Sequence, residues 1–253
     1  AGNPGALLAE VNPVDSEALS DEVLEGKQIF YNTDDLRMSK DAYISCASCH
    51  LDGGSDGQVW DFTQVGEGLR NTISLRGRAG LGHGRVHWTA NFDEIQDFEN
   101  DIRHFAGGTG FMSDTDFDAT NDPLGNPKAG LSPELDALSA YVGSLNHIPE
   151  SPYRNSDGTL TEPGQSGQAV FTSKGCNTCH GGASFTDGLR HDVGTIQASS
   201  GQGIGEPLAG IGFDTPTLLG VWNTAPYLHN GQAATLDDVL DNSTHVGTLS
   251  LQE

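Results

Sequence analysis

The chain has 253 residues, with 35 acidic side chains against 12 Lys and Arg, and its formal net charge at pH 7 is −23. This charge argues against a nucleic-acid partner, because binding to phosphates needs positive side chains. The acidic residues are spread along the chain, which fits either a solvated surface or the steering of a basic partner. No stretch approaches the ~20 apolar residues of a membrane-spanning helix. The length allows one large domain or two small ones.

The first 19 residues predict a lead-in segment, since they contain Pro4 and Pro13 and few periodic apolar positions. Their first four residues resemble a processed end, and no signal peptide is recognisable. Ser20 is a candidate N-cap for a helix that continues to Phe30. Farther along, the apolar spacing over residues 92–102 predicts a second helical segment.

The acidic stretch over residues 113–127 is expected to be a loop. Its aspartates have the spacing of a calcium-binding loop, but the stretch lacks the glycine of the sharp turn and the closing glutamate. A solvated acidic loop is therefore the alternative. Ser132 as the cap and Pro133 in the first turn then predict a clear helix.

Two copies of the motif Cys-x-x-Cys-His contain all four cysteines of the chain. They consist of Cys46, Cys49 and His50, and of Cys176, Cys179 and His180. This spacing attaches a c-type haem: the thiols add to the porphyrin vinyl groups, and the histidine becomes the proximal ligand of the iron. A zinc site would need paired knuckles closer in sequence, and a thioredoxin-like thiol pair would not need the histidine. We therefore expect two covalent haems, which supply much of the apolar core in a chain that is only 35% hydrophobic.

The second half of the chain repeats landmarks of the first. Residues 26–30 resemble 167–171, residues 72–77 resemble 215–220, and residues 93–95 resemble 237–239. Pro149 and Pro152 mark a linker between the copies. Three landmarks in the same order indicate a duplication. We expect a mainly α chain of two tandem cytochrome c-like domains with long loops, each holding one covalent c-type haem, over residues 20–150 and 151–253 after a lead-in over residues 1–19.

The order of these motifs resembles that of the bacterial di-haem cytochrome c peroxidase and MauG family. The strongest part of the likeness is Phe-Asp-Thr-Pro-Thr-Leu at 213–218 with Thr-Ala-Pro-Tyr-Leu-His at 224–229, and the likeness covers most of the chain from about residue 20. In these peroxidases one haem accepts electrons and the other reduces hydrogen peroxide, and a calcium ion lies between the domains. The resemblance implies the same arrangement here.

The resemblance also implies particular residues between the two domains. Asn71, in the Arg-Asn-Thr segment, matches the side-chain ligand of the calcium ion, and the backbone carbonyls of Thr224 and Pro226 match two more oxygen ligands. A simple turn residue is the alternative for Asn71. Trp88 resembles the family's tryptophan between the haems, and a core aromatic is its alternative.

The distal side of the first haem departs from the family pattern. The peroxidases use a glutamine and a glutamate after the tryptophan, ending in a Glu-Met pair that this chain lacks. A carboxylate is needed there to shuttle a proton, and Glu94 and Glu99 are the tentative substitutes, with a solvated helix face as the other interpretation of both. His87, directly before the tryptophan, could bind the first iron or act as a base above it, and His83 in a glycine-rich loop is the competing ligand.

The second haem of the family is bound by a methionine, or in MauG by a tyrosine, after the Thr-Ala-Pro-Tyr segment. The only methionines here are Met38 and Met112, and no tyrosine follows that segment. His245 lies where the ligand belongs and is the expected one. An imidazole in place of the thioether should lower the reduction potential. His191 and His229 match family positions near the haem and are expected to donate hydrogen bonds there.

The sequence thus predicts a di-haem c-type redox protein that relays electrons between two haems and reduces hydrogen peroxide at the N-terminal one. Whether it is a peroxidase-type enzyme depends on an open position at the first iron. The alternative is a pure electron-transfer cytochrome with both irons six-coordinate, and a MauG-like oxidant is a weaker option. The expected partners are a redox protein or a small electron donor, and a homodimer is compatible with the resemblance. Haem attached through cysteines implies a bacterial periplasmic or extracellular setting.

Overall fold

The computed structural model describes residues 16–201 and 208–247. The α-helices are α1 (Asp21–Tyr31), α2 (Cys46–Cys49), α3 (Glu99–His104), α4 (Asp114–Ala119), α5 (Pro133–Ser144), α6 (Glu162–Ser173), α7 (Leu236–Leu240) and α8 (Ser243–Val246). The strands are β1 (Val59–Phe62), β2 (Gly68–Asn71), β3 (Arg190–His191) and β4 (Phe213–Asp214). Short 3₁₀ turns include η2 (Leu51–Gly53), η4 (Ile95–Phe98), η5 (Cys176–Thr178), η6 (Ala198–Ser200) and η7 (Val221–Asn223). Helices and long loops dominate over sheet, which confirms the prediction of a mainly α chain.

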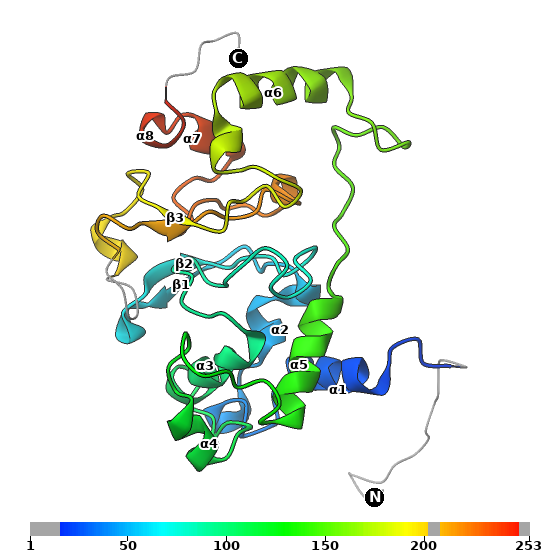
Figure 1. Ribbon diagram of the computed structural model, residues 1–253, viewed down its shortest axis with the longest axis vertical. Coiled ribbons are helices and arrows are strands. Elements are labelled where there is room, and N and C mark those ends of the chain that lie inside the picture. The colour runs from blue at the N-terminus through cyan, green and yellow to red at the C-terminus, as the bar shows by residue number, and fades with distance from the viewer. Residues whose placement is uncertain (1–15, 202–207, 248–253) are drawn as a thin grey trace, which may run out of the picture.

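Helices α1 and α5 cross in the first half of the chain (Figure 1). Both begin as predicted: the Ser20 hydroxyl accepts the backbone N–H of the third residue of α1, and Ser132 does the same for α5. The helices approach closely at Gly26, where a Cβ atom would overlap the backbone carbonyl of Ala137. Phe30 is then packed edge-to-face on Tyr141, with the ring centroids 5.1 Å apart. This crossing anchors one apolar cluster, whose buried members all lie between residues 30 and 142.

The prediction of a loop over residues 113–127 is wrong for its first part. Residues 114–119 form helix α4, because the Ser113 hydroxyl caps it and Phe117 buries its ring in the core. The predicted helical segment over 92–102 is present as η4 followed by α3. The interpretation of Glu99 as part of a solvated face is wrong, since its side chain is fully buried.

Two small antiparallel ladders lie where the halves of the chain meet. Strand β1 pairs with β2, with Val59 opposite Asn71, and β3 pairs with β4. Figure 1 shows β3 directly above β1 and β2. Backbone hydrogen bonds join the halves at this level, from the Asp214 N–H to the Trp88 carbonyl at 2.8 Å and from the Asn71 N–H to the His229 carbonyl at 2.6 Å.

The helices of the second half are less buried than α1 and α5. In Figure 1 helix α6 lies above α7, near α8, and far from the α1–α5 crossing. The segment 167–171 lies in α6, just as its counterpart 26–30 lies in α1. None of the residues of α6, α7 or α8 is buried. Among the residues that the structure describes, no helix combines the length and the apolar character needed to cross a membrane.

Candidate functional site

The first Cys-x-x-Cys-His motif opens onto a large apolar cavity. Helix α2 and the residue after it present Cys46, Cys49 and His50 to this cavity, whose volume is about 250 Å³. The opposite walls come from the helices α1, α3 and α5, from both strands of the first ladder and from the loop that carries Trp88. A cavity this large beside two unpaired thiols needs a large apolar occupant, because protein interiors are otherwise close-packed.

The imidazole of His50 is prepared to act as a metal ligand. Its Nδ1 lies 3.3 Å from the carbonyl oxygen of Gly54, which can only accept, so Nδ1 carries the proton and Nε2 keeps its lone pair. Burial lowers the pKa of His50, with smaller opposing effects from the Gly54 hydrogen bond and from Asp56. The neutral form that binds iron is therefore favoured.

Arg78 provides a direct test of whether haem fits the cavity. Its side chain is 5% exposed and lines the cavity, and no residue that the structure describes accepts a hydrogen bond from its guanidinium. Burial lowers the pKa of Arg78, and the charge of Asp214 opposes this only in part. A buried charge of this kind needs a counter-charge. A haem propionate would supply one, and the vinyl edge would meet the two thiols. The residues present therefore fit a covalently bound haem.

A histidine and an aspartate lie together in the same cavity. The Nε2 atom of His87 lies 3.6 Å from Oδ2 of Asp101, and both side chains line the cavity. Nδ1 of His87 donates to Oδ1 of Asn91 at 2.8 Å, so the lone pair belongs to Nε2. Burial raises the pKa of Asp101, and the charge of His87 opposes this only in part. Burial therefore favours the protonated form of the Asp101 carboxyl group at this position.

The other residues predicted for the distal side lie elsewhere. The Glu99 carboxylate is bound to Arg103 at 2.8 Å and to the backbone N–H groups of Phe111 and Met112. Glu94 accepts the backbone N–H groups of Lys128 and Ala129. Neither glutamate lines the cavity.

His83 is also outside the lining of the cavity. It is 8% exposed, and burial lowers its pKa, with a further effect of Arg78. Of the two histidines predicted as ligands of the first iron, the structure places only His87 in the cavity. Sequence reasoning missed Asp101, whose one signal was its place in the segment after Trp88 where the family keeps its acid.

An aromatic group joins the cavity to the second half. Trp88 lines the cavity and donates its indole N–H to the Asn71 carbonyl at 3.0 Å. It lies edge-on to Phe213 and His229, each 6.4 Å away between ring centroids, and these two rings are stacked at 3.9 Å. Burial and the charge of Arg70 lower the pKa of His229 to about 3, so its imidazole stays neutral.

The residues predicted to bind calcium come close at this boundary. The Asn71 side chain donates to the Pro226 carbonyl, while its Oδ1 atom is buried without a hydrogen-bond partner among the described residues. Thr224 lies two residues before Pro226 and borders a small polar pocket beside the linker. An unsatisfied amide oxygen beside backbone carbonyls is compatible with a hard cation such as calcium.

The second Cys-x-x-Cys-His motif has matching local chemistry. Nδ1 of His180 lies 3.3 Å from the Phe185 carbonyl, which again leaves Nε2 as the free ligand atom. The ring of His245 in α8 lies 6.3 Å from that of His180 between centroids. Two imidazoles bound to opposite faces of one metal would be about this far apart, since metal–nitrogen bonds to histidine measure about 2 Å. Burial lowers the pKa of His245, and His180 adds to this effect.

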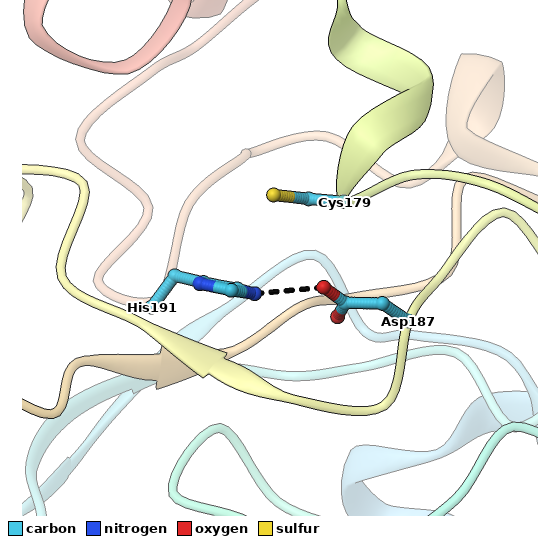
Figure 2. A group of neighbouring side chains, drawn as sticks. All are labelled: Cys179, Asp187 and His191. Atoms are coloured by element: carbon cyan, nitrogen blue, oxygen red, sulfur yellow. Dashed lines mark hydrogen bonds and ion pairs between the residues drawn. The ribbon is translucent and has the colours of Figure 1, made fainter.

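Three side chains around the second motif could also hold a metal ion. Ligand atoms of Cys179, Asp187 and His191 lie within 4.8 Å of one another, and Figure 2 shows them converging. Nε2 of His191 is 2.7 Å from Oδ2 of Asp187. Sulfur, oxygen and nitrogen ligands would suit zinc, but Cys179 is one of the two thiols that the motif uses to attach haem. The sequence pattern gave no indication of Asp187.

Comparisons with known proteins find a cytochrome c-like family and relatives that cover most of this chain. The family described as "RoxA-like, cytochrome c-like" matches residues 212–247. Hydrazine synthase subunit gamma of Kuenenia stuttgartiensis is 31% identical over 255 residues, covering 85% of this chain and 68% of that protein. A solved structure of hydrazine synthase from this organism has a TM-score of 0.62 at 28% identity and covers 94% of this chain and 85% of its own.

Two further relatives are peroxidase-like or MauG-like. Cytochrome-c peroxidase IdrP1 of Pseudomonas sp. (strain SCT) is 24% identical over 282 residues, covering 90% of this chain and 73% of that protein. The structure of a MauG-like protein associated with microbial copper homeostasis has a TM-score of 0.59 at 22% identity, covering 91% of this chain and 76% of its own, and so shares the fold.

Proposed function

Because the chain belongs to the bacterial di-haem cytochrome c peroxidase and MauG family, it is a c-type cytochrome with covalent haem c, and we propose that it relays electrons between two haems and reduces hydrogen peroxide at the first. One haem is held by residues 20–150 and the other by residues 151–253. Their thioether bonds form at Cys46 and Cys49 and at Cys176 and Cys179, and the proximal ligands are His50 and His180. Each haem supplies a redox-active iron that the side chains alone cannot provide.

The observation that carries the proposal is the His87–Asp101 pair in the first cavity. Peroxide reduction consumes two electrons and two protons to give two waters, so the site must hold and move protons. Burial raises the pKa of the Asp101 carboxyl group and so favours the protonated form, which is the form that can donate. His87 accepts a proton at Nε2 while Asn91 holds its ring through Nδ1. Asp101 thus takes the place that sequence reasoning gave to Glu94 and Glu99.

Electrons reach the first site from the second half in this proposal. Trp88 lines the cavity and contacts the stacked rings of Phe213 and His229, so conjugated side chains connect the first site to the second half. A calcium ion bound by Asn71 and by the carbonyls of Thr224 and Pro226 would fix this boundary, and the orphaned Asn71 amide oxygen supports that assignment.

The second haem acts as the electron entry point. We assign His245 as a residue that would bind its iron together with His180, supported by the 6.3 Å between the two ring centroids and by its buried Nδ1 atom, which has no hydrogen-bond partner among the described residues. Ligation by two imidazoles gives a lower potential than ligation by histidine and methionine. The donor is a redox protein or a small reductant in the bacterial periplasm, and a basic surface on it would match the charge of −23.

Visible spectroscopy with peroxide turnover tests this function. In the oxidised protein with both haems attached, we expect a high-spin haem whose band shifts on adding cyanide, and a low-spin haem that does not respond. Hydrogen peroxide should be consumed with a reduced donor present. Two low-spin haems in both redox states, without peroxide turnover, would instead identify a pure electron carrier.

The similarity to hydrazine synthase subunit gamma raises a second candidate. It is favoured by the identity of 31%, which extends over 85% of this chain. The chain would then act as one subunit of a larger assembly, with a small nitrogen compound at the first haem. Tight binding of hydrazine, detected by a shift of the first haem's spectrum, without peroxide turnover would support it.

A further inference from the structure

Strand β1 places a second tryptophan on the wall of the first haem cavity. Its residues alternate between exposed and half-buried, so Trp60 and Phe62 face inward while Val59 and Asp61 face solvent. Trp60 lines the cavity and is itself partly exposed. One indole therefore extends from the haem site to the protein surface.

The indole of Trp60 is hydrogen-bonded to a carboxylate. Its Nε1–H donates to Oδ2 of Asp56 at 2.9 Å. The other carboxylate oxygen, Oδ1, accepts the backbone N–H of Gln58 at 2.9 Å, which fixes the side chain of Asp56 in place. A carboxylate at this distance stabilises positive charge on the indole, because the local dielectric is lower than that of water.

The remaining charge near this indole is balanced. Arg70 stands opposite Trp60 in the β1–β2 ladder, and its guanidinium is bound to Glu67 at 2.9 Å. Arg70 is thus paired with Glu67, and the charged group bonded to the indole nitrogen is the carboxylate of Asp56.

The three tryptophans of the chain have different surroundings. Trp88 also lines the cavity, but its N–H is bound to a neutral backbone carbonyl and its ring faces the second half. Trp222, in η7, is partly exposed and lies outside the cavity lining. Only Trp60 combines contact with the cavity, exposure to solvent and a bond to a carboxylate.

We propose that Trp60 is a redox-active side chain that passes single electrons from reductants at the protein surface directly to the first haem site. This inference rests on the proposed function, because hydrogen peroxide reacting at the first haem is the oxidant. The indole of Trp60 gives one electron to that site, and its N–H proton moves along the hydrogen bond to Asp56. A one-electron donor in solution then reduces the indole radical, and the proton moves back from Asp56 to Nε1 of Trp60. The site thereby obtains electrons without the second haem.

The test is to treat the protein with hydrogen peroxide in the absence of a donor and map oxidised residues by peptide mass spectrometry. We expect hydroxylated products at Trp60 well above those at Trp222, and suppression of them by an added donor such as ascorbate. Trp60→Phe should abolish an indole radical signal in electron paramagnetic resonance and speed the bleaching of the first haem severalfold. Trp222→Phe is the matched control and should change neither.

Asp56→Asn separates the charge from the hydrogen bond, because the amide oxygen can still accept the indole N–H. We expect it to lower the yield of the Trp60 radical while the spectra of both haems stay normal. Equal oxidation of Trp60 and Trp222, or oxidation of other side chains with Trp60 intact, would overturn the inference. If peroxide causes no spectral change at all, the proposed function itself fails and the inference fails with it; a normal peroxide reaction with an unmodified Trp60 overturns the inference alone.

Discussion

The two halves of this chain contain the same motif but differ in what surrounds it. The first half has an apolar cluster of its own, centred on Phe30, Leu135 and Leu138, all of which are at most 1% exposed. In the second half, the helices α6, α7 and α8 have no buried residue. Its few buried apolar side chains, such as Phe213 and Tyr227, lie near the boundary with the first half. A helix that buries no side chain gains little stability from tertiary packing, so the haem proposed for the second half would supply the core that these helices lack.

The largest expected effect follows from removing each haem in turn. Replacing Cys176 and Cys179 by Ser should leave α6, α7 and α8 without a packing partner, and amide hydrogen exchange in these helices should become nearly as fast as in an unfolded chain. Replacing Cys46 and Cys49 by Ser should leave α1 and α5 partly protected, because their contact is made by protein side chains. Hydrogen exchange with mass spectrometry on both variants measures this. Equal loss of protection in the two halves would contradict the comparison.

The halves should also differ in chemistry: burial raises the pKa of Asp101 beside the first motif, whereas hydrogen bonds lower the pKa of Asp187 beside the second motif in spite of burial. Asp101→Asn removes the carboxyl proton, and we expect peroxide turnover to fall about 10²-fold with little change in the spectrum of the second haem. Asp93→Asn, an exposed carboxylate in the preceding segment, is the control and should retain full activity. Unchanged turnover in Asp101→Asn would remove Asp101 from the mechanism.

Two glycines at matching positions of the repeated segments test the same difference in packing between α1 and α6. A Cβ atom at Gly26 would overlap the Ala137 carbonyl, whereas one at Gly167 in α6 meets nothing within 4 Å. Gly26→Ala should therefore destabilise the protein by about 1–3 kcal/mol, as overpacking does. Gly167→Ala should stabilise α6 by about 0.5–1 kcal/mol, because alanine favours the helix. Denaturant unfolding of both variants measures the difference, and a similar cost at both positions would show that α6 packs as tightly as α1.

The sequence predicted the features that depend on local chemistry. The caps at Ser20 and Ser132 were visible because a hydroxyl before an apolar run is enough to start a helix. Helix α4 was missed, because its acidic composition indicated a solvated loop. The Ser113 cap and the single buried residue Phe117 were weaker signals. Asp101 was missed for a different reason: its role comes from the direction in which α3 faces the cavity, and no local pattern encodes that direction. The exposure of α6, α7 and α8 could not be predicted either, because burial depends on tertiary contacts that no local pattern encodes.

The smallest expected effect concerns Asp214, at the boundary of the halves. Burial raises the pKa of its carboxyl group to about 7, although Arg78 and Arg190 pull it down. Between the ordinary value of 3.8 and about 7, the folded protein keeps a proton that the unfolded chain has lost. The stabilising contribution of this group is therefore fully present below pH 4 and lost as the pH rises to 7. Asp214→Asn should remove this dependence.

Thermal unfolding of wild type and Asp214→Asn at pH 5 and pH 8 gives the measurement. We expect the variant to gain about 1–2 kcal/mol relative to wild type between these two values, while Asp118→Asn, on the exposed face of α4, should follow wild type. A parallel pH dependence in wild type and Asp214→Asn would mean that Arg78 keeps the carboxylate charged. The Arg78 guanidinium would then pair with Asp214 at the boundary between the halves rather than with a haem propionate in the first cavity. The comparison therefore also decides whether the charge of Arg78 is balanced by Asp214 of the second half or by a haem in the first cavity.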